Sequence, residues 1–352
     1  MEEENSATSH ASDTMTTTEE MQITGGNTVT SRWSPSSRFY FPLAVVVVGV
    51  IGTVGNALIV YALVASKQYK KYWLILNQNA LDLYTCALMV ITFSVRHSDI
   101  RRTGSYGYWH CTLITSDTFV RFGTYGSVIN LAMITVERYL KICTKKKLRR
   151  WMIYSAMAFA WIASVVYIVT VVFSTTVVVN GTCRPYTSFK NKFAKSFYII
   201  FSFLSFYVVI LFVFMFCYGR ILIVIRRQAK VMASHTIPQS SITQTLSNKI
   251  QTNVIKTMVL VSALYAVMWL PQNVVMFLYH FLFLKPNKVV VIIYYVTMFC
   301  QFLYMSINPF IYATTFDPVK QVLFRMIPWQ RTVEQATENV SNTTTCLTRF
   351  RD

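Results

Sequence analysis

Charged residues are scarce in this chain. Only 13% of its 352 residues are Asp, Glu, Lys or Arg, whereas 54% are hydrophobic. Soluble proteins carry about 25% charged residues. So few charges cannot cover the water-exposed surface of a soluble protein of this length. The composition therefore excludes an ordinary cytosolic enzyme and a disordered chain.

Acidic residues are scarcer still, with 14 Asp and Glu against 33 Lys and Arg, which gives a formal net charge of +19. The basic residues stand in short groups between apolar runs and do not gather on one face, as a nucleic-acid partner would require. Signatures of catalysis are also lacking: the sequence shows no Ser-His-Asp set, metal cluster, phosphate loop or paired intramembrane Asp. We therefore predict a membrane protein that is not an enzyme and binds no nucleic acid.

Apolar runs dominate the rest of the chain. A membrane-spanning helix needs about 20 apolar residues, and the runs that qualify are Phe39–Ala65, Tyr72–Val95, Trp109–Lys141, Trp151–Cys183, Ser196–Gly219, Thr257–Leu284 and Val289–Phe316. They lack the alternation of barrel strands. The predicted fold is an all-α membrane protein, a seven-transmembrane helix bundle over residues 39–316 with a short amphipathic C-terminal helix.

The segments outside the spans indicate topology. Residues 1–38 are acidic and rich in Ser and Thr, and we expect a disordered extracellular tail without a cleavable signal peptide. Residues 317–327 predict a helix lying on the inner surface of the membrane lipids, followed by a cytoplasmic tail over 328–352. This topology puts 21 Lys and Arg in the cytoplasm, 11 outside and Arg121 within a helix. The bias agrees with a multi-pass plasma membrane protein whose N-terminus is extracellular.

Each span carries polar or aromatic residues that a plain anchor would avoid. In chain order they are Gly55-Asn56, Asn77-Gln78-Asn79-Ala80-Leu81-Asp82, Glu137-Arg138-Tyr139, Trp161, Tyr218, Trp269-Leu270-Pro271 and Asn308-Pro309-Phe310-Ile311-Tyr312. Together they resemble the rhodopsin-like (class A) family of G protein-coupled receptors, over about residues 39–327. The resemblance implies a receptor that binds an extracellular ligand and activates a heterotrimeric G protein by movement of the sixth helix.

Two other classes of seven-helix membrane protein have the same number of spans. An opsin needs a Lys in the seventh helix to hold retinal, and residues 289–319 contain none, with Phe302 in the matching region. A transporter or channel stays open as the alternative, and ion flux against ligand-dependent G protein activation would separate the two.

The resemblance also assigns roles to the switch residues. Coupling to the G protein falls to Glu137, Arg138, Tyr139, Tyr218, Asn308, Pro309 and Tyr312. The toggle beneath the ligand is Trp269 with Pro271, and Tyr265 stands where Phe is usual. An interfacial snorkelling arginine and ordinary aromatic packing are the structural alternatives. The family often has an acidic residue low in the sixth helix, and this chain has Gln251-Thr252 there.

A carboxylate in mid-membrane is costly and suggests function. Asp82 lies midway through the second span. The resemblance implies that it binds a sodium ion together with Ser127 and Asn308; the alternative is a neutral Asp that ties helices together. No other cofactor is expected.

The remaining expectations concern the two ends of the bundle. The resemblance implies a disulfide between Cys111 and Cys183; Cys111 stands two residues farther from Arg138 than is usual, so we expect a bulge or extra turn. Asn180 lies in a glycosylation sequon, and Ser341, Thr343, Thr344, Thr345 and Thr348 are candidate sites for arrestin binding after phosphorylation.

The ligand pocket is expected at Asp117, Val120, Arg121, Gln272, Met276 and Met298. Receptors for amines have an Asp where this chain has Val120. Arg121 either pairs with Asp117, four residues earlier, or engages a negative group on the ligand, such as an acidic peptide. A surrounding rim of basic residues would attract anions, and this rim favours the second interpretation.

Overall fold

The computed structural model describes residues 35–95, 104–144, 148–179, 181–184, 188–189, 191–234, 242–281 and 288–326. Most of the predicted N-terminal tail, the whole cytoplasmic tail with its candidate phosphorylation sites, and Asn180 lie outside these residues. So do the basic rim residues Arg96, Arg101, Arg102, Lys190 and Lys285.

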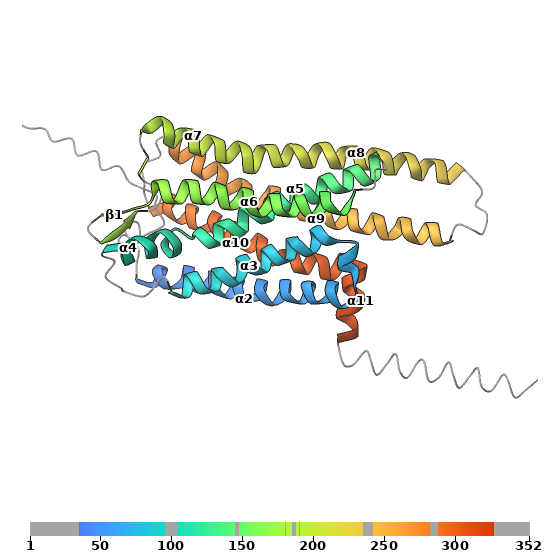
Figure 1. Ribbon diagram of the computed structural model, residues 1–352, viewed down its shortest axis with the longest axis horizontal. Coiled ribbons are helices and arrows are strands. Elements are labelled where there is room, and N and C mark those ends of the chain that lie inside the picture. The colour runs from blue at the N-terminus through green and yellow to red at the C-terminus, as the bar shows by residue number, and fades with distance from the viewer. Residues whose placement is uncertain are drawn as a thin grey trace, which may run out of the picture.

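Seven spans of the described chain are helices long and apolar enough to cross a membrane, and they run roughly along one axis (Figure 1). Their main helices are α2 Pro35–Ala65, α3 Trp73–Val95, α5 Thr118–Cys143, α6 Arg150–Thr175, α8 Val209–Ser234, α9 Ile242–Phe281 and α10 Lys288–Thr315. The hydrocarbon core of a membrane offers no hydrogen-bond partners, and a helix satisfies its backbone N–H and C=O groups internally. The predicted seven-helix bundle is therefore confirmed.

Two of the spans are interrupted by π-helical turns. In the third span, α4 Gly104–His110 leads into the π segment η2 Cys111–Thr115, and Asp117 adopts a left-handed φ of 54° before α5. This interruption accommodates the additional residues between Cys111 and Arg138, and the expected bulge is confirmed. In the fifth span, α7 Lys192–Phe203 passes through the π segment η3 Leu204–Val208 into α8. Such turns free backbone groups for other partners.

The predicted end of the fourth span at Cys183 is wrong. Helix α6 ends at Thr175, and the chain then forms an antiparallel hairpin of β1 Val177–Val179 and β2 Thr182–Arg184, with Val178 opposite Cys183. The apolar residues here are consecutive valines, whose β-branching favours strands, and Gly181 supplies the turn at φ 74°. The absence of charged residues does not distinguish this hairpin from the membrane span that precedes it.

The two ends of the bundle differ in architecture. The hairpin and α4 lie at one end, called here the hairpin end, and the short helix α11 Asp317–Met326 crosses the other, called the α11 end (Figure 1). Helices α8 and α9 extend beyond the bundle at the α11 end, well past the predicted limits of their spans. In α11, Val319 is buried whereas the neighbouring Lys320 is exposed, as expected for an amphipathic surface helix.

Candidate functional site

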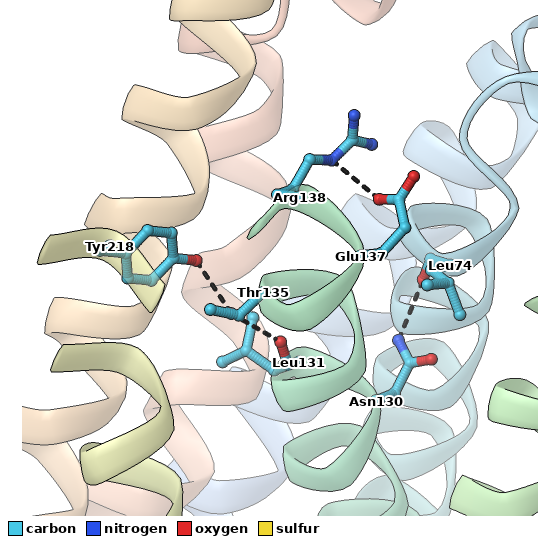
Figure 2. Close-up of polar contacts among 7 residues, drawn as sticks. All are labelled: Leu74, Asn130, Leu131, Thr135, Glu137, Arg138 and Tyr218. Carbon is cyan, nitrogen blue, oxygen red and sulfur yellow. Dashed lines mark hydrogen bonds and ion pairs between the residues drawn. The ribbon is translucent and has the colours of Figure 1, made fainter. Parts of the chain in front are cut away.

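The Glu-Arg-Tyr motif occupies the last two turns of α5, at the α11 end of the bundle. Figure 2 shows its Glu137 and Arg138 side chains. Arg138 Nε is 3.0 Å from Glu137 Oε2. This contact has the distance of an ion pair, but Nε does not meet the angle of a hydrogen bond. Arg138 is nevertheless only 5% exposed. A guanidinium is thus held inside the bundle by one neighbouring carboxylate in imperfect alignment.

An aromatic side chain provides the second contact of Arg138. Its guanidinium carbon lies 5.4 Å from the ring centroid of Tyr72, just before α3, which is cation–π distance. Tyr72 in turn packs edge-to-face with Phe316, which lies between α10 and α11, and their ring centroids are 5.0 Å apart. The sequence prediction missed Tyr72, because a lone aromatic before a span has no distinguishing pattern.

Tyr218 links three helices near Arg138. Its hydroxyl lies 3.0 Å from Oγ1 of Thr135 on α5 and 3.2 Å from Oγ of Ser262 on α9 (Figure 2 shows the contact with Thr135). Tyr312, the other predicted switch tyrosine, is fully buried, and its hydroxyl has no hydrogen bond within the described residues. The two tyrosines are therefore not bonded to each other in this state.

The predicted toggle aromatics, Trp269 and Tyr265, belong to a cluster of tilted and edge-on rings in the middle of the bundle. The Trp269 ring lies 5.1 Å from Tyr265 and 6.4 Å from Tyr125. Tyr265 donates a hydrogen bond to the carbonyl of Phe206 in η3, and Tyr207 donates one of 3.0 Å back to the carbonyl of Ala266. The π turn and α9 are thus joined reciprocally, directly before Pro271.

Asp82 is fully buried among hydrogen-bond donors from three helices. Ser127 Oγ donates to Oδ1 at 2.6 Å and Asn308 Nδ2 donates to Oδ2 at 2.9 Å, so the structure brings together the three residues expected here. Gln78, which the sequence prediction did not assign to the site, donates from Nε2 to both carboxylate oxygens at 3.3 Å.

Further buried amides continue from Gln78. Asn130 Nδ2 donates to Gln78 Oε1 at 2.9 Å and to the Leu74 carbonyl at 2.9 Å (the second contact is drawn in Figure 2). Asn77 donates to Asn130 at 2.8 Å, and the indole of Trp161 donates to Asn77 at 3.0 Å. A continuous series of hydrogen bonds therefore runs from α6 through α3 and α5 to Asp82.

A small cavity of about 50 Å³ lies above the toggle, in the half of the bundle nearer the hairpin. Its lining includes five of the six predicted pocket residues, namely Asp117, Val120, Arg121, Gln272 and Met298. Met276 is not among them and instead packs against an apolar cluster. Trp269 also lines the cavity, and its buried indole N–H has no hydrogen-bond partner among the described residues.

A disulfide closes the hairpin end. Cys111 in η2 and Cys183 in β2 are bonded, with their Cα atoms 5.4 Å apart. The predicted pairing is confirmed, and it ties the hairpin to the top of the third span beside the cavity. Among the described residues no group of three His, Cys, Asp or Glu side chains is arranged to hold a metal ion.

Comparison with known proteins identifies the family. A family model described as 7 transmembrane receptor (rhodopsin family) matches residues 55–312, well over half of the chain. The crystal structure of squid rhodopsin is similar with a TM-score of 0.69 and 17% sequence identity, over 86% of this chain and 88% of the squid chain. At that identity the likeness shows the fold alone. A search of curated proteins gives no match. The chain belongs to the rhodopsin family of seven-transmembrane receptors.

Proposed function

We propose that this receptor binds a ligand at its hairpin end and activates a heterotrimeric G protein at its α11 end, which faces the cytoplasm. The observation that carries this proposal is the burial of Arg138 between Glu137 and Tyr72. A cation buried at the end of a helix, and held by one imperfectly aligned ion pair, is suited to release toward a partner. Activation is then a shift between two states of the bundle.

The hinge of this shift is the middle of α9. Pro271 lacks a backbone N–H, so the helix has lost one internal hydrogen bond there and bends more easily. Trp269 touches the cavity on one side and Tyr265 on the other. A ligand that displaces the indole therefore moves the part of α9 that Ser262 ties to Tyr218 near Arg138.

Ligand-free signalling in cells tests the coupling proposal without a known ligand. Arg138→Ala should abolish G protein activation while the amount of receptor at the cell surface stays unchanged. Arg150→Ala is the matched control, because Arg150 is exposed at the start of α6. Ion currents that persist in Arg138→Ala, with no G protein response in the unmodified chain, would instead support the transporter or channel alternative.

The ligand is proposed to carry a negative group or another strong hydrogen-bond acceptor. The cavity is lined by the Arg121 side chain and by Trp269, whose buried indole N–H has no hydrogen-bond partner among the described residues and could donate to a ligand oxygen. A water molecule needs about 10–15 Å³ of such space, so about 50 Å³ admits one functional group and not a whole ligand. A carboxylate on a small molecule or an acidic peptide entering from the hairpin end fits these features. Lys192 and Lys195 at the start of α7 add positive charge at the hairpin end of the bundle (Figure 1).

Asp117 supports a second candidate, a cationic amine. The π turn and the left-handed backbone at Asp117 place this residue in the cavity lining together with Val120. A carboxylate there could replace the Asp that amine receptors have at the position of Val120.

Charge substitutions separate the two ligands in a screen of carboxylates, acidic peptides and amines. For an anionic agonist, Arg121→Ala should weaken potency far more than Arg121→Lys, and Asp117→Asn should be neutral or improve potency. Lys195→Gln is the control for general loss of positive charge. An amine that activates the receptor and loses this effect specifically in Asp117→Asn would establish the second candidate.

A further inference from the structure

Both oxygens of the Asp82 carboxylate already accept hydrogen bonds from the protein. Oδ1 accepts from Ser127 at 2.6 Å, Oδ2 accepts from Asn308 at 2.9 Å, and the Gln78 amide bridges both oxygens at 3.3 Å. The same Gln78 Nε2 donates to Ser127 Oγ. The amide nitrogen thus lies between the carboxylate and the serine hydroxyl, which are two of the three groups expected to hold sodium.

The orientation of the Gln78 amide is determined by its other side. Its Oε1 accepts the N–H of Asn130, whose own Oδ1 accepts from Asn77. Turning the amide over would direct Oε1 at the Asp82 carboxylate and Nε2 at the Asn130 amide nitrogen, which is two repulsive contacts in place of several favourable ones. The donor therefore points at Asp82, and the series of amides back to Trp161 keeps it there.

This donor set does not fit a sodium ion. A hard cation is bound by oxygen lone pairs, but here the positive end of an amide dipole occupies the space that those lone pairs face. The Ser127 hydroxyl donates its hydrogen bond to Asp82 and accepts one from Gln78, so both its donor and an acceptor position are already used. To admit an ion, Gln78 would have to withdraw, which would leave its own buried amide without partners and remove one of the two hydrogen bonds that Asn130 Nδ2 donates. Both losses are costly at this depth.

We infer that the Gln78 amide takes the place of the sodium ion that the family resemblance implies, so that the stability of this receptor does not depend on sodium. Gln78 is fully buried, and it joins Asp82 to α5 through Ser127 and Asn130. An internal neutral donor thus links α3 to α5 permanently, and Asn308 links α10 to the same carboxylate, whereas a dissolved ion would link the helices only when bound. The inference goes beyond the proposed function, because it requires neither a ligand nor a G protein.

The test measures the unfolding temperature of the full-length, detergent-purified receptor in NaCl, KCl and choline chloride at equal ionic strength. The unmodified chain should give the same temperature in all three salts. Gln78→Leu keeps most of the side-chain volume but removes the donor, and should gain a sodium-specific rise of about 2–4 °C, as expected for an ion that binds only the folded state. Asn79→Ala is the matched control. Asn79 is the buried amide next to Gln78, and among the described residues its side chain bonds only to the Ile75 carbonyl.

A sodium-specific rise in the unmodified chain would overturn the inference, and this result needs no variant to fold. Gln78→Ala, which leaves more room for an ion with its water, serves if Gln78→Leu fails to fold. A folded variant that remains indifferent to sodium would show that Gln78 is not what excludes the ion, and would equally reject the inference. If Asn79→Ala showed the same sodium-specific rise in unfolding temperature, the effect would come from a general loosening of α3, and the inference would be rejected.

Discussion

The hydroxyl of Tyr218 on α8 lies 3.2 Å from the hydroxyl of Ser262 on α9, and the same tyrosine contacts Thr135 on α5 at 3.0 Å. Thr135 precedes Arg138 by about one helical turn. Helix α9 is therefore tied to the helix that carries the buried arginine through a single phenol. Movement of α9 away from α5 has to break one of these two bonds.

Ser262→Ala should raise ligand-free signalling. The substitution removes only the bond between α8 and α9, which is worth about 0.5–1.5 kcal/mol and so about a twofold to tenfold change in the population of the active state. Second-messenger output per receptor at the cell surface measures it. Ser174→Ala is the control, because the exposed Ser174 hydroxyl bonds within its own helix. Unchanged output in Ser262→Ala would mean that the tie to Tyr218 does not hold the resting state.

Gln251→Glu should lower ligand-free signalling. Gln251 lies in the extension of α9 at the α11 end, where the family often has an acidic residue that restrains the arginine. Nearby, α9 is held to α10 by the bond of 2.8 Å from Thr257 to Thr315. If a carboxylate at position 251 acts on Arg138 as the acidic residue of the family does, it adds a charge-assisted bond of about 1.5–3 kcal/mol, which corresponds to more than a tenfold fall in the active population.

The control for this change is Gln228→Glu, which adds the same charge at an exposed position on α8. Equal signalling by Gln251→Glu and the unmodified receptor, in a receptor that signals without ligand, would contradict the argument. Equal reductions in both variants would attribute the effect to net charge at the α11 end and not to a contact with Arg138.

The sequence predicted the bundle well because its signal is local. A run of uncharged residues longer than about 20 indicates a membrane helix wherever it occurs. The signal fails where apolar residues continue past the helix, as at β1, where the valines of a hairpin extend the fourth run. Helix limits at the α11 end were also placed short, because α8 and α9 continue into polar sequence where hydropathy no longer marks them.

The sequence predicts those residues of the candidate site that belong to family motifs. It does not predict residues whose role depends on tertiary contacts. Asp82, Ser127 and Asn308 come together as expected. Gln78 belongs to the polar motif of the second span, yet its role depends on its partner Asn130, which is distant in sequence, and on the orientation of its side-chain amide. No spacing rule gives such a direction, because it follows from the packing of α3 against α5.

Loss of the disulfide should reduce the receptor at the cell surface. Cys111 and Cys183 are 72 residues apart, so in the chain-entropy model the bond contributes about 3–5 kcal/mol. Cys111→Ala and Cys183→Ala should each lower surface expression, and the double variant should be little worse than either single one. Cys300→Ala, which removes a free cysteine of α10, is the control. Strictly additive losses would show that the two residues act separately.

Gly52→Ala should destabilise the fold because three helices meet at this glycine. A Cβ atom on Gly52 of α2 would lie 2.5 Å from the Cys86 sulfur of α3 and 2.5 Å from the Ser306 hydroxyl of α10. Ser306 is itself held by a bond of 2.9 Å to the Val48 carbonyl on α2, so it cannot move aside without losing that bond. Overpacking of this kind costs about 1–3 kcal/mol.

The matched substitution is Gly219→Ala in α8, where an added Cβ meets no atom within 4 Å. Alanine is the better helix former by about 0.5–1 kcal/mol, so this variant should unfold at the same or a higher temperature than the unmodified receptor. Thermal unfolding in detergent compares all three proteins. If the unfolding temperature of Gly52→Ala is not lower than that of Gly219→Ala, then α2, α3 and α10 do not approach as closely as described. Separation of these helices would also move Asn308 on α10 away from Asp82 on α3, so this comparison checks the packing on which the buried polar site depends.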